Sequence, residues 1–454
     1  MSRYKAYAEY KDSGVEWIGS YPCGWELTRV KFESYVKARV GWHGLKADDF
    51  TTEGPYLVTG SDFRGPVIKW EDCYHCDFSR YEQDPNIQLV NGDLLITKDG
   101  TIGKVALVSN LNGKATLNSG VFVVRPLEES YISKFYFWLL HSSVFTGFVD
   151  FSKTGSTIVH LYQDTFVNFR FAMPHLIEQE KITNFLDHET AKIDTLIAKH
   201  QGLIKLLKEK RQAVISHAVT KGLDPNAPMR DSCVEWLGEV PEHWEVLCIK
   251  HIVSIPVTDG PHETPNFLDS GVPFISAEAV SSGRIDFEKI RAHISKKDNK
   301  RFSQKYSPKK FDIYMVKSGA TTGVTAINET DAEFNIWSPL AVIRCNEKSD
   351  PYFILNFLRS INFKEAVELN WSVGTQQNIG MGVIENLHVT RPPISEAKLI
   401  AKVLLEKCFV FDKAIDFANR QIEFSKERRA ALISAAITGK IDVSDEKSSA
   451  KEFV

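Results

Sequence analysis

One long, charged helical pattern occurs twice in this chain. The first copy, Glu178–Gly222, reads EQEKITNFLDHETAKIDTLIAKHQGLIKLLKEKRQAVISHAVTKG, and the second, Glu396–Gly439, reads EAKLIAKVLLEKCFVFDKAIDFANRQIEFSKERRAALISAAITG. Placed 218 positions apart, both copies carry a ladder with alternating steps of four and three residues, which keeps one apolar seam facing a partner helix. The pattern predicts two paired helices of about 43 residues, each roughly 65 Å long at 1.5 Å per residue.

A second repeat precedes each half of the chain. The segment DSGVEWIGSYPCGWEL, Asp12–Leu27, returns as DSCVEWLGEVPEHWEV, Asp231–Val246. Two tryptophans at matched places, with glycine and proline between them, predict a compact turn held by aromatic burial. We interpret each copy as a structural clasp without chemistry of its own.

Between clasp and helix, both halves alternate short apolar runs with turns. In the first half, GDLLITKDGTIGKVALV (Gly92–Val108) predicts strand, glycine-rich loop and strand. The apolar run Asn118–Pro126 predicts a further strand, Lys134–Phe145 has helical spacing, and Lys153–Leu161 is a polar loop. In the second half KKFDIYMVKSGATTGVTAI, SPLAVIRC and GTQQNI correspond to these segments. The expected fold class is therefore α+β, with two mixed α/β domains separated by two long antiparallel coiled-coil helices in an internal pseudo-two-fold repeat.

The repeats also set the expected domain boundaries. They are 1–27 for the first clasp, 28–175 for the first globule, 176–222 for the central helix, 223–246 for the linker and second clasp, 247–393 for the second globule, 394–442 for the distal helix, and 443–454 for a disordered tail. The short linker Gly222–Arg230 holds the second clasp near the end of the first helix. By equivalence, the first clasp should lie at the end of the second helix.

Composition limits the class of protein. The 454 residues are 43% hydrophobic and 25% charged, as expected for soluble globular domains, and we find no membrane-spanning run and no signal peptide. Seven irregularly spaced cysteines favour a reducing compartment, so we expect a cytoplasmic protein. With a net charge of −3, any binding to nucleic acid requires basic residues gathered on one face.

The duplicated plan itself indicates a class of target. Two similar but non-identical globules around a pseudo-dyad suit a target with two-fold backbone symmetry and two different half-sites. Duplex DNA is such a target, and dimeric DNA-binding proteins use the same principle.

These residues carry a family resemblance. The two VEW-containing clasps, the loops GDLLITKDGTIG and GTQQNI, and the helix endings Glu209–Thr220 and Glu427–Thr438 resemble the specificity subunits of type I restriction-modification enzymes over essentially the whole chain. The resemblance implies that 28–175 and 247–393 are target recognition domains, each reading half of a bipartite DNA sequence. It also implies that the helices set the gap between half-sites and dock two modification (methyltransferase) subunits, which restriction subunits join.

The same resemblance implies that this chain carries no cofactor, because S-adenosylmethionine, ATP and Mg²⁺ belong to the other subunits. One departure stands at the start of the second helix, where PISEAKLI replaces HLIEQEKI and the Glu-Gln pair is missing. This departure questions whether the two partners dock equally.

We find no catalytic or metal-binding constellation in the sequence. The segment Lys98–Lys104 fails as a P-loop, because its glycine spacing is wrong and Val105 stands where Ser or Thr would bind Mg²⁺. Cys73, His75 and Cys76 lack a second ligand pair and are expected to be free thiols beside a histidine. Two rival functions are a self-contained modification enzyme, which the missing motifs disfavour, and a coiled-coil adaptor that binds only proteins.

Candidate contacts follow from charge and position. A basic run in the second globule and scattered cations in the first suit DNA phosphates, and the amides of the polar loop suit base edges. The DNA-binding candidates are Arg64, Lys69, Lys98, Lys104, Lys153, Lys296, Lys297, Lys300, Arg301, Lys317, Gln376, Gln377 and Asn378. Apolar residues off the helix seam suggest partner helices that complete a bundle. These partner candidates are Ile182, Phe185, Leu196, Leu203, Leu399, Val403 and Phe417.

Overall fold

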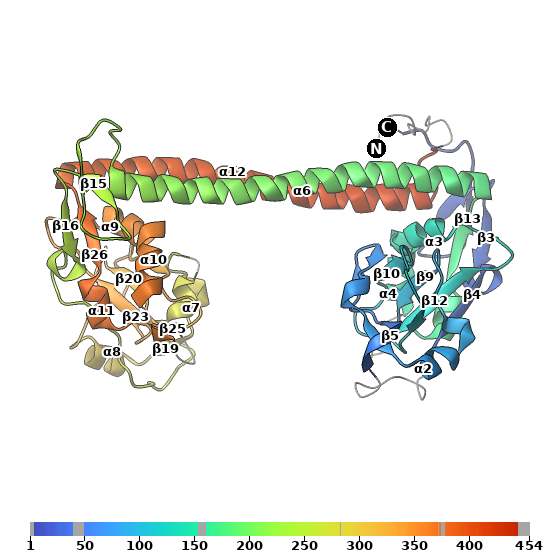
Figure 1. The fold of residues 1–454 in the computed structure, drawn as a ribbon, viewed down its shortest axis with the longest axis horizontal. Coiled ribbons are helices and arrows are strands. Elements are labelled where there is room, and N and C mark those ends of the chain that lie inside the picture. Colours follow the sequence, from blue (N-terminus) through green and yellow to red (C-terminus); the bar gives the residue numbers. More distant parts are fainter. Residues whose placement is uncertain are drawn as a thin grey trace. The chain divides into compact units, whose positions relative to one another are not determined.

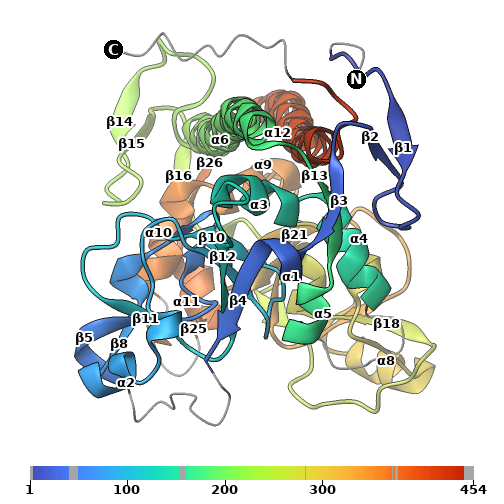
Figure 2. The same ribbon diagram turned by 90° about the vertical axis from the view of Figure 1, so that its right-hand side faces the viewer.

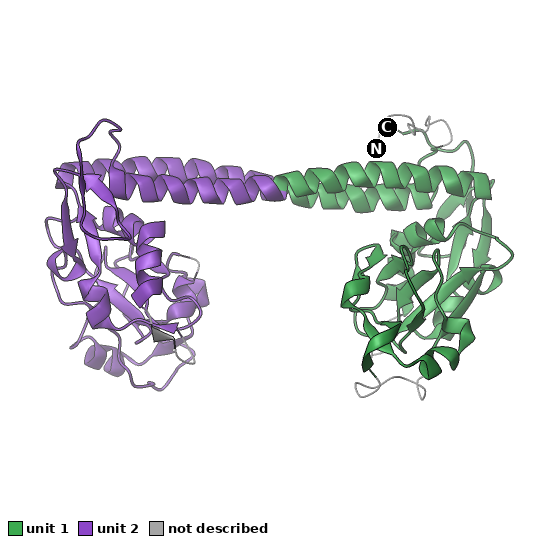
Figure 3. Cartoon of the chain, viewed as in Figure 1, with its two compact units in different colours: residues 1–200, 420–454 green, residues 201–419 purple. Residues whose placement is uncertain are grey.

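The computed structural model describes residues 4–39, 50–152, 160–281, 283–370, 372–373 and 377–443. The chain divides into two compact units (Figure 3): unit 1 is Met1–His200 with Arg420–Val454, and unit 2 is Gln201–Asn419. The two predicted long helices are α6, Leu176–Lys221, with 46 residues, and α12, Ile394–Ile437, with 44 residues. Each helix contributes one part to unit 1 and the other to unit 2. The tail from residue 444 onward lies outside the described residues.

Unit 1 is built on a four-stranded antiparallel sheet (Figure 1). Its strand order is β10 (Val105–Leu107), β9 (Leu94–Thr97), β12 (Val121–Pro126), β4 (Ser34–Ala38). A smaller sheet has the order β11 (Ala115–Leu117), β5 (Phe50–Val58), β8 (Tyr74–Cys76). Alternate residues of β9 point into different cores, with Leu94 and Ile96 in one and Leu95 in the other. Burial on both faces explains why the strand sequences are continuously apolar.

The expected helix Lys134–Phe145 is instead two helices, α3 (Ser133–Leu140) and α4 (Ser143–Ser152). The Ser142 hydroxyl donates a hydrogen bond to the Leu139 carbonyl at 2.7 Å, a local bond that competes with continuation of the helix. Helix α3 lies between the main sheet and α6 (Figure 2). It therefore links the globule of unit 1 to the long helix.

Unit 2 repeats the two sheets. The larger sheet has the strand order β17 (Thr258–Asp259), β23 (Leu340–Ile343), β20 (Ile313–Val316), β21 (Thr325–Ile327). The smaller sheet has the strand order β19 (Ala292–Ile294), β18 (Val272–Ile275), β22 (Asn335–Ile336). Its helices are α7 (Ala277–Val280), α8 (Lys296–Phe302), α9 (Pro351–Leu358), α10 (Ile361–Asn370) and α11 (Met381–Asn386).

The equivalence extends to single ion pairs in the two main sheets. Arg125 Nε lies 2.7 Å from Asp93 Oδ1 in unit 1, and Arg344 Nε lies 2.6 Å from Asp312 Oδ1 in unit 2. The duplication that is visible in the sequence is therefore also present in the structure.

Each clasp ties helix ends together within its own unit. In unit 1, β1 (Tyr10–Asp12) pairs with β2 (Ser20–Pro22), Trp25 Nε1 donates to Glu178 Oε1 at 3.0 Å, and the Tyr10 hydroxyl donates to the Gly439 carbonyl at 2.7 Å. The first clasp therefore joins the start of α6 to the end of α12, which confirms its expected place.

The second clasp makes the equivalent contacts in unit 2. Strand β14 (Met229–Asp231) pairs with β15 (Glu239–Pro241), and Trp244 Nε1 donates to Glu396 Oε1 at 3.1 Å. Lys221 Nζ donates to the Glu239 carbonyl at 2.7 Å.

The remaining short elements complete the two globules. They are β3 (Glu26–Arg29), α1 (Val30–Glu33), β6 (Phe63–Arg64), β7 (Val67–Ile68), α2 (Phe78–Glu82), α5 (Gln163–Val167), β13 (Arg170–Met173), β16 (Glu245–Cys248), β24 (Ser372–Val373), β25 (Gln377–Asn378) and β26 (His388–Arg391). Strand β13 pairs with β3, and β26 pairs with β16, so the strand that leads into each long helix is held beside the clasp.

Within each unit the two helix segments run antiparallel. In unit 1 Arg429 Nε lies 2.9 Å from Asp194 Oδ1, and in unit 2 Arg211 Nε lies 3.4 Å from Asp412 Oδ1. These two ion pairs are equivalent positions of the repeat, so the arginine that interrupts both apolar ladders has the same partner in each copy. No helix in the described ranges combines the length and the apolar character needed to cross a bilayer.

Candidate nucleic-acid interface

The glycine-rich loop of each unit joins two buried strands of the main sheet. In unit 1 this glycine loop is Thr97–Lys104, where Gly100 and Gly103 have φ of 70° and 78°, a left-handed conformation that favours glycine. The Thr97 hydroxyl donates to the Thr101 carbonyl at 2.5 Å and accepts from the Lys104 backbone N–H at 2.9 Å. One threonine therefore fixes the loop from the inside, and Lys104 at its end is exposed.

The described end of the predicted polar loop, residues 160–161, lies against the glycine loop in unit 1. The Leu161 N–H donates to the Lys98 carbonyl at 3.0 Å, and His160 Nδ1 lies 2.6 Å from Asp99 Oδ1. Lys104 is exposed, whereas the Lys98 ammonium lies 5.5 Å from the centroid of the Phe122 ring. Lys153 lies outside the described residues.

Unit 2 has the same juxtaposition, with amides in the polar loop. Its glycine loop is Val316–Gly323, and the Gly319 N–H donates to the Gln377 carbonyl at 3.0 Å. The Ile379 N–H donates to the Lys317 carbonyl at 2.8 Å. Gln377 and Asn378 are exposed beside this loop, and Gln376 lies outside the described residues. Exposed amide side chains are groups that read base edges, and a glycine-rich loop beside them suits the approach of a phosphate.

A buried carboxylate collects cations beside the glycine loop of unit 2. Asp259 has a side chain with 0% exposure, and Lys305 Nζ lies 2.5 Å from its Oδ1. Lys317 Nζ and His262 Nε2 lie 3.3 Å and 3.0 Å from its Oδ2. Burial alone would raise the pKa of the Asp259 carboxyl, but the hydrogen bonds and charges of Lys305 and Lys317 outweigh burial and hold this pKa below its ordinary value.

This cluster changes the expected role of Lys317. Its side chain is only 13% exposed and faces Asp259, so it is not the solvent-facing lysine that the sequence suggested. Sequence reasoning missed Asp259 because Lys305 and Lys317, which meet it, are far away in the chain, and it missed His262 together with Asp259. A signal was present in the acid of TDGPH, Thr258–His262, which follows an apolar run.

The basic run of unit 2 is partly neutralised by its neighbours. Arg301 Nη2 lies 2.8 Å from Glu263 Oε1 and 3.1 Å from Asp298 Oδ1. Lys296, Lys297 and Lys300 are exposed on α8, and the described part of the chain gives none of them an ion-pair partner. These three lysines are therefore the members of the run that are best placed to bind phosphate.

In unit 1, Arg64 and Lys69 converge on one acid. Arg64 Nη2 lies 3.0 Å from Asp72 Oδ2, and Lys69 Nζ lies 2.8 Å from Asp72 Oδ1. The hydrogen bond from Lys69 is the main reason that the pKa of Asp72 is lowered. Both cations line a cleft of about 660 Å³. His75 lines it too, as do Tyr56, Trp70, Asn110 and Asn112, which the sequence analysis did not single out. Aromatic and amide groups beside cations are typical of nucleic-acid contacts.

The cysteines that the sequence analysis considered as metal ligands are buried thiols. Cys73 and Cys76 are buried, and burial raises the pKa of Cys73 to about 12, which keeps this thiol protonated and a poor metal ligand. Within the described ranges, no three His, Cys, Asp or Glu side chains are grouped to hold a metal ion.

Two of the helix partner candidates were wrong. Ile182 and Phe185 are buried in the core of unit 1, and the Phe185 ring lies 5.4 Å from that of Tyr4. The globule and the clasp cover this part of α6, so these residues stabilise the chain itself. Val403 is half-buried, whereas four other candidates are exposed: Leu196, Leu203, Leu399 and Phe417. Further exposed apolar residues on the helices that the sequence analysis did not name are Leu206, Leu405, Phe409, Val410 and Phe424.

Comparison with known proteins agrees with this architecture. The family model described as type I restriction modification DNA specificity domain matches residues 45–206 and 241–423. The chain is 23% identical over 434 residues to the type I restriction enzyme MjaVIII specificity subunit of Methanocaldococcus jannaschii, covering 93% of this chain and 94% of that one. It is also 23% identical over 415 residues to the type I restriction enzyme EcoBI specificity subunit of Escherichia coli, covering 86% and 84%.

Solved structures share the fold. A chain from a study of complex assembly and conformational transition of the type I restriction-modification system superposes with a TM-score of 0.69 at 18% identity, covering 92% of this chain and 98% of that one. The HsdS subunit of Thermoanaerobacter tengcongensis superposes with a TM-score of 0.53 at 17% identity, covering 93% and 98%. The two matched regions, one in each half, and the duplicated glycine loops lead to one conclusion: the chain belongs to the type I restriction-modification DNA specificity family, the family of the specificity subunits.

Proposed function

We propose that this chain reads a bipartite, asymmetric DNA sequence and holds the methyltransferase and restriction subunits that act on that DNA. The observation that carries the proposal is the duplicated but non-identical loop platform, in which a glycine loop and the described end of a polar loop lie together in each unit. The platform of unit 1 presents Lys104 and His160, and that of unit 2 presents Gln377 and Asn378. Different side chains on one scaffold would select different bases in the two half-sites.

Phosphate binding would come from the exposed lysines of α8 and from the cations beside the cleft of unit 1. A net charge of −3 does not prevent binding to a polyanion, because binding depends on local clusters of exposed cations such as the three lysines of α8. Catalysis, S-adenosylmethionine, ATP and Mg²⁺ would belong to the partner subunits. The expected location is the cytoplasm, where those partners and cellular DNA are available.

The scaffolding part of the proposal rests on the exposed apolar faces of α6 and α12. Apolar side chains such as Leu206, Phe417 and Phe424 are at least 60% exposed, although each helix already has a partner helix. Helices from two methyltransferase subunits would cover these faces and complete helical bundles.

Methylome sequencing tests the whole proposal. The gene is expressed in a host without related systems, with and without its partner methyltransferase gene. An interrupted bipartite motif, methylated only when both genes are present, is the expected result. Methylation by this chain alone would instead indicate an enzyme, and no motif together with protein–protein binding would indicate an adaptor.

Domain exchange tests the assignment of half-sites. Residues 28–175 are replaced by the corresponding domain of a relative, and the methylated motif is sequenced again. One half of the motif should change while the other half stays the same. A change in both halves would contradict independent recognition by the two units.

A further inference from the structure

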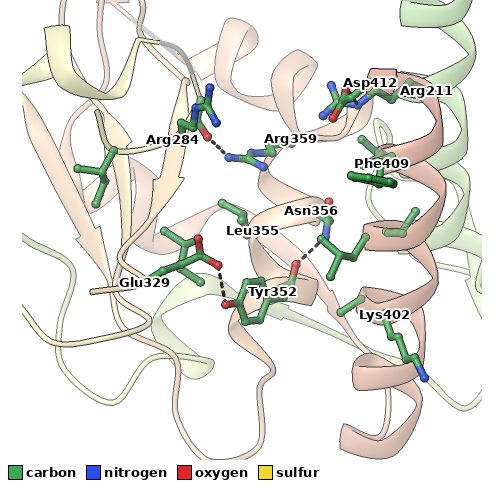
Figure 4. A pocket seen from close by; sticks show the side chains of 18 of the residues that line it. Arg211, Arg284, Glu329, Tyr352, Leu355, Asn356, Arg359, Lys402, Phe409 and Asp412 are labelled. Atoms are coloured by element: carbon green, nitrogen blue, oxygen red, sulfur yellow. Dashed lines mark hydrogen bonds and ion pairs between the residues drawn. The ribbon is translucent and has the colours of Figure 1, made fainter. Parts of the chain in front are cut away.

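A groove of about 1150 Å³ lies within unit 2, between α9 and the segment of α12 in the same unit (Figure 4). Phe409 on α12 lies across the groove from Tyr352 and Asn356 on α9, and Leu405 of α12 also lines the groove. Leu405 and Phe409 are 71% and 61% exposed, so two large apolar side chains face solvent inside a concave surface.

The internal repeat shows what fills the corresponding space in unit 1. In unit 1 the Ser143 N–H donates to Ser434 Oγ at 3.0 Å, and in unit 2 the Ile361 N–H donates to Ser216 Oγ at 2.8 Å. These matched bonds place positions 218 apart in correspondence. Asn356 therefore corresponds to Trp138, Leu405 to Asp187, Phe409 to Ala191 and Arg211 to Arg429.

In unit 1 the indole of Trp138 occupies this position. The residue is 5% exposed, and its Nε1 donates to Asp187 Oδ1 at 3.2 Å. The Arg429 guanidinium carbon lies 5.7 Å from the centroid of the Trp138 ring, within the range of a cation–π contact. Lys134 completes the closure with an ion pair to Asp187. Unit 1 thus supplies its own aromatic side chain between α3 and α6.

Unit 2 lacks that aromatic side chain. The short Asn356 side chain turns back and donates from Nδ2 to the Tyr352 carbonyl at 2.8 Å. Leu405 replaces the aspartate that would bind an indole, and Phe409 replaces an alanine. Arg211 lines the groove with an ion pair of 3.4 Å to Asp412, and so an arginine remains where Arg429 contacts the indole in unit 1.

We propose that the groove of unit 2 binds an aromatic side chain carried on a helix of one methyltransferase subunit, which takes the place that Trp138 fills in unit 1. The inference rests on the proposed scaffolding function and identifies its anchor. Leu405 and Phe409 supply an apolar wall, and Arg211 supplies a cation for the ring face. A buried aromatic side chain in such a pocket is the usual form of an interface hot spot.

The groove also places a guanidinium group, that of Arg359, beside the proposed aromatic anchor. Arg359 donates to the carbonyls of Thr325, at 3.0 Å, and Gly283, and no carboxylate in the described residues forms an ion pair with it. Burial and the neighbouring Arg211 lower the pKa of Arg359 to about 10, so the guanidinium stays charged at neutral pH. A carboxylate next to the aromatic residue of the partner would complement this charge.

The two docking faces are consequently unequal. Where unit 2 exposes Val410 and Phe417 on α12, the corresponding positions of α6 in unit 1 are Lys192 and Lys199. Two identical methyltransferase subunits would therefore bind this chain with different affinities, and the tighter binding would be at unit 2.

Titration of the full chain with its purified methyltransferase subunit, followed by native mass spectrometry and calorimetry, tests the inference. The unaltered chain should bind two subunits in two resolved steps. N356W fills the groove with the residue of unit 1 and should weaken the tighter step at least tenfold while leaving the weaker step unchanged. F409A, which creates the residue present in unit 1, should weaken the same step without filling the groove. N386W, at an exposed position of α11 in unit 2 and outside the groove, is the matched control and should change neither step.

Thermal unfolding of every variant guards against a folding defect, and N356W should keep a midpoint equal to or above that of the unaltered chain. Two bound subunits with unchanged affinities in both N356W and F409A would overturn the groove assignment. Self-association of the free chain that N356W abolishes would also overturn it, by identifying a second copy as the occupant. An unaltered chain that binds no methyltransferase subunit would overturn the proposed scaffolding function itself, together with the groove assignment.

Discussion

At the scale of single residues, the two units use the same few polar contacts to hold very different surfaces. The pairs Trp25–Glu178 and Trp244–Glu396 hold the clasps, and the ion pairs Asp93–Arg125 and Asp312–Arg344 hold the main sheets. These contacts are buried or half-buried, where an unmatched partner is costly. The loop side chains that differ between the units, Lys104 and His160 in unit 1 and Gln377 and Asn378 in unit 2, are exposed. The shared contacts therefore stabilise both units, while the exposed loop surfaces differ.

The clasp carboxylates should matter for stability. E178A leaves the buried Trp25 Nε1 without its acceptor at 3.0 Å and removes the partner of the Tyr7 hydroxyl at 2.5 Å. We expect a loss of about 1–3 kcal/mol in the free energy of unfolding, measured by chemical denaturation. E396A, which removes the same contact from Trp244, should have a similar effect, and an effect of E178A below a few tenths of a kcal/mol would contradict the role of the clasp.

The cluster around Asp259 should make stability depend on acid. The pKa of Asp259 is held below its ordinary value in the folded chain, so its ion pairs contribute stability above that ordinary value, and the contribution is lost as pH falls through the lowered pKa. In D259N this loss should be absent, and unfolding midpoints measured between neutral and strongly acidic pH should fall less steeply than in the unaltered chain. D269N is the control, because Asp269 is an exposed acid outside this cluster. An equal acid dependence of the unfolding midpoint in D259N and the unaltered chain would show that the Asp259 ion pairs do not contribute to stability.

The exposed lysines of α8 should contribute to DNA binding in a salt-dependent way. Each phosphate contact that is removed lowers the slope of log K against log salt concentration by about 1. The triple variant K296Q/K297Q/K300Q should therefore bind DNA more weakly with a slope reduced by up to about 3, but should recognise the same sequence. K289Q, whose lysine lies 3.1 Å from Asp286, should keep the original slope. A changed recognition sequence in the triple variant would assign these lysines to base contacts instead.

At the scale of elements, the long helices depend on their ends as much as on their seam. Both end in a glycine with positive φ, Gly222 at 79° and Gly439 at 66°, which terminates the helix at the point where a clasp covers it. The surroundings differ, because a Cβ on Gly439 would lie 2.3 Å from Pro22 Cγ, whereas a Cβ on Gly222 would meet nothing closer than 3.4 Å.

The two glycines therefore predict unequal costs of substitution. G222A should cost about 1 kcal/mol, from backbone strain alone. G439A should cost clearly more, by an additional 1–3 kcal/mol or so, because Pro22 and the first clasp must also move. Denaturant titration of the two single variants measures this difference. Equal losses in the free energy of unfolding would mean that Pro22 and the first clasp move away from a Cβ at position 439 at no energetic cost.

At the scale of the whole molecule, the repeat gives one chain two recognition units and two helix segments for each. The helices connect the units, so we expect their length to set the spacing of the two half-sites. One heptad inserted after His200, with a matching heptad after Asn419, keeps the seam and adds about 10 Å of helix at 1.5 Å per residue. The gap in the methylated motif should then change by roughly three base pairs at 3.4 Å per step, or methylation should be lost. Methylation with an unaltered gap would mean that the helices do not act as a ruler.

The sequence alone determined much of this protein. The ladder of alternating four and three steps predicted both long helices, the apolar runs predicted strands β9, β10 and β12, and the repeat of the clasp predicted that residues near Trp25 meet the end of α12. These features are encoded by local periodicity or by duplication, and both can be read without knowledge of distant contacts.

Only the tertiary structure decided which surfaces remain free. Ile182 and Phe185 resemble Leu405 and Phe409 in sequence, as large apolar residues off the helix seam. In the fold the first two are covered by the globule of unit 1, and the last two line an open groove. Lys317 reads as one member of a basic run, yet it faces buried Asp259. The physical reason is that exposure depends on which distant segment packs over a side chain. Here a single tryptophan at position 138, replaced by asparagine at position 356, distinguishes a closed surface from an open one.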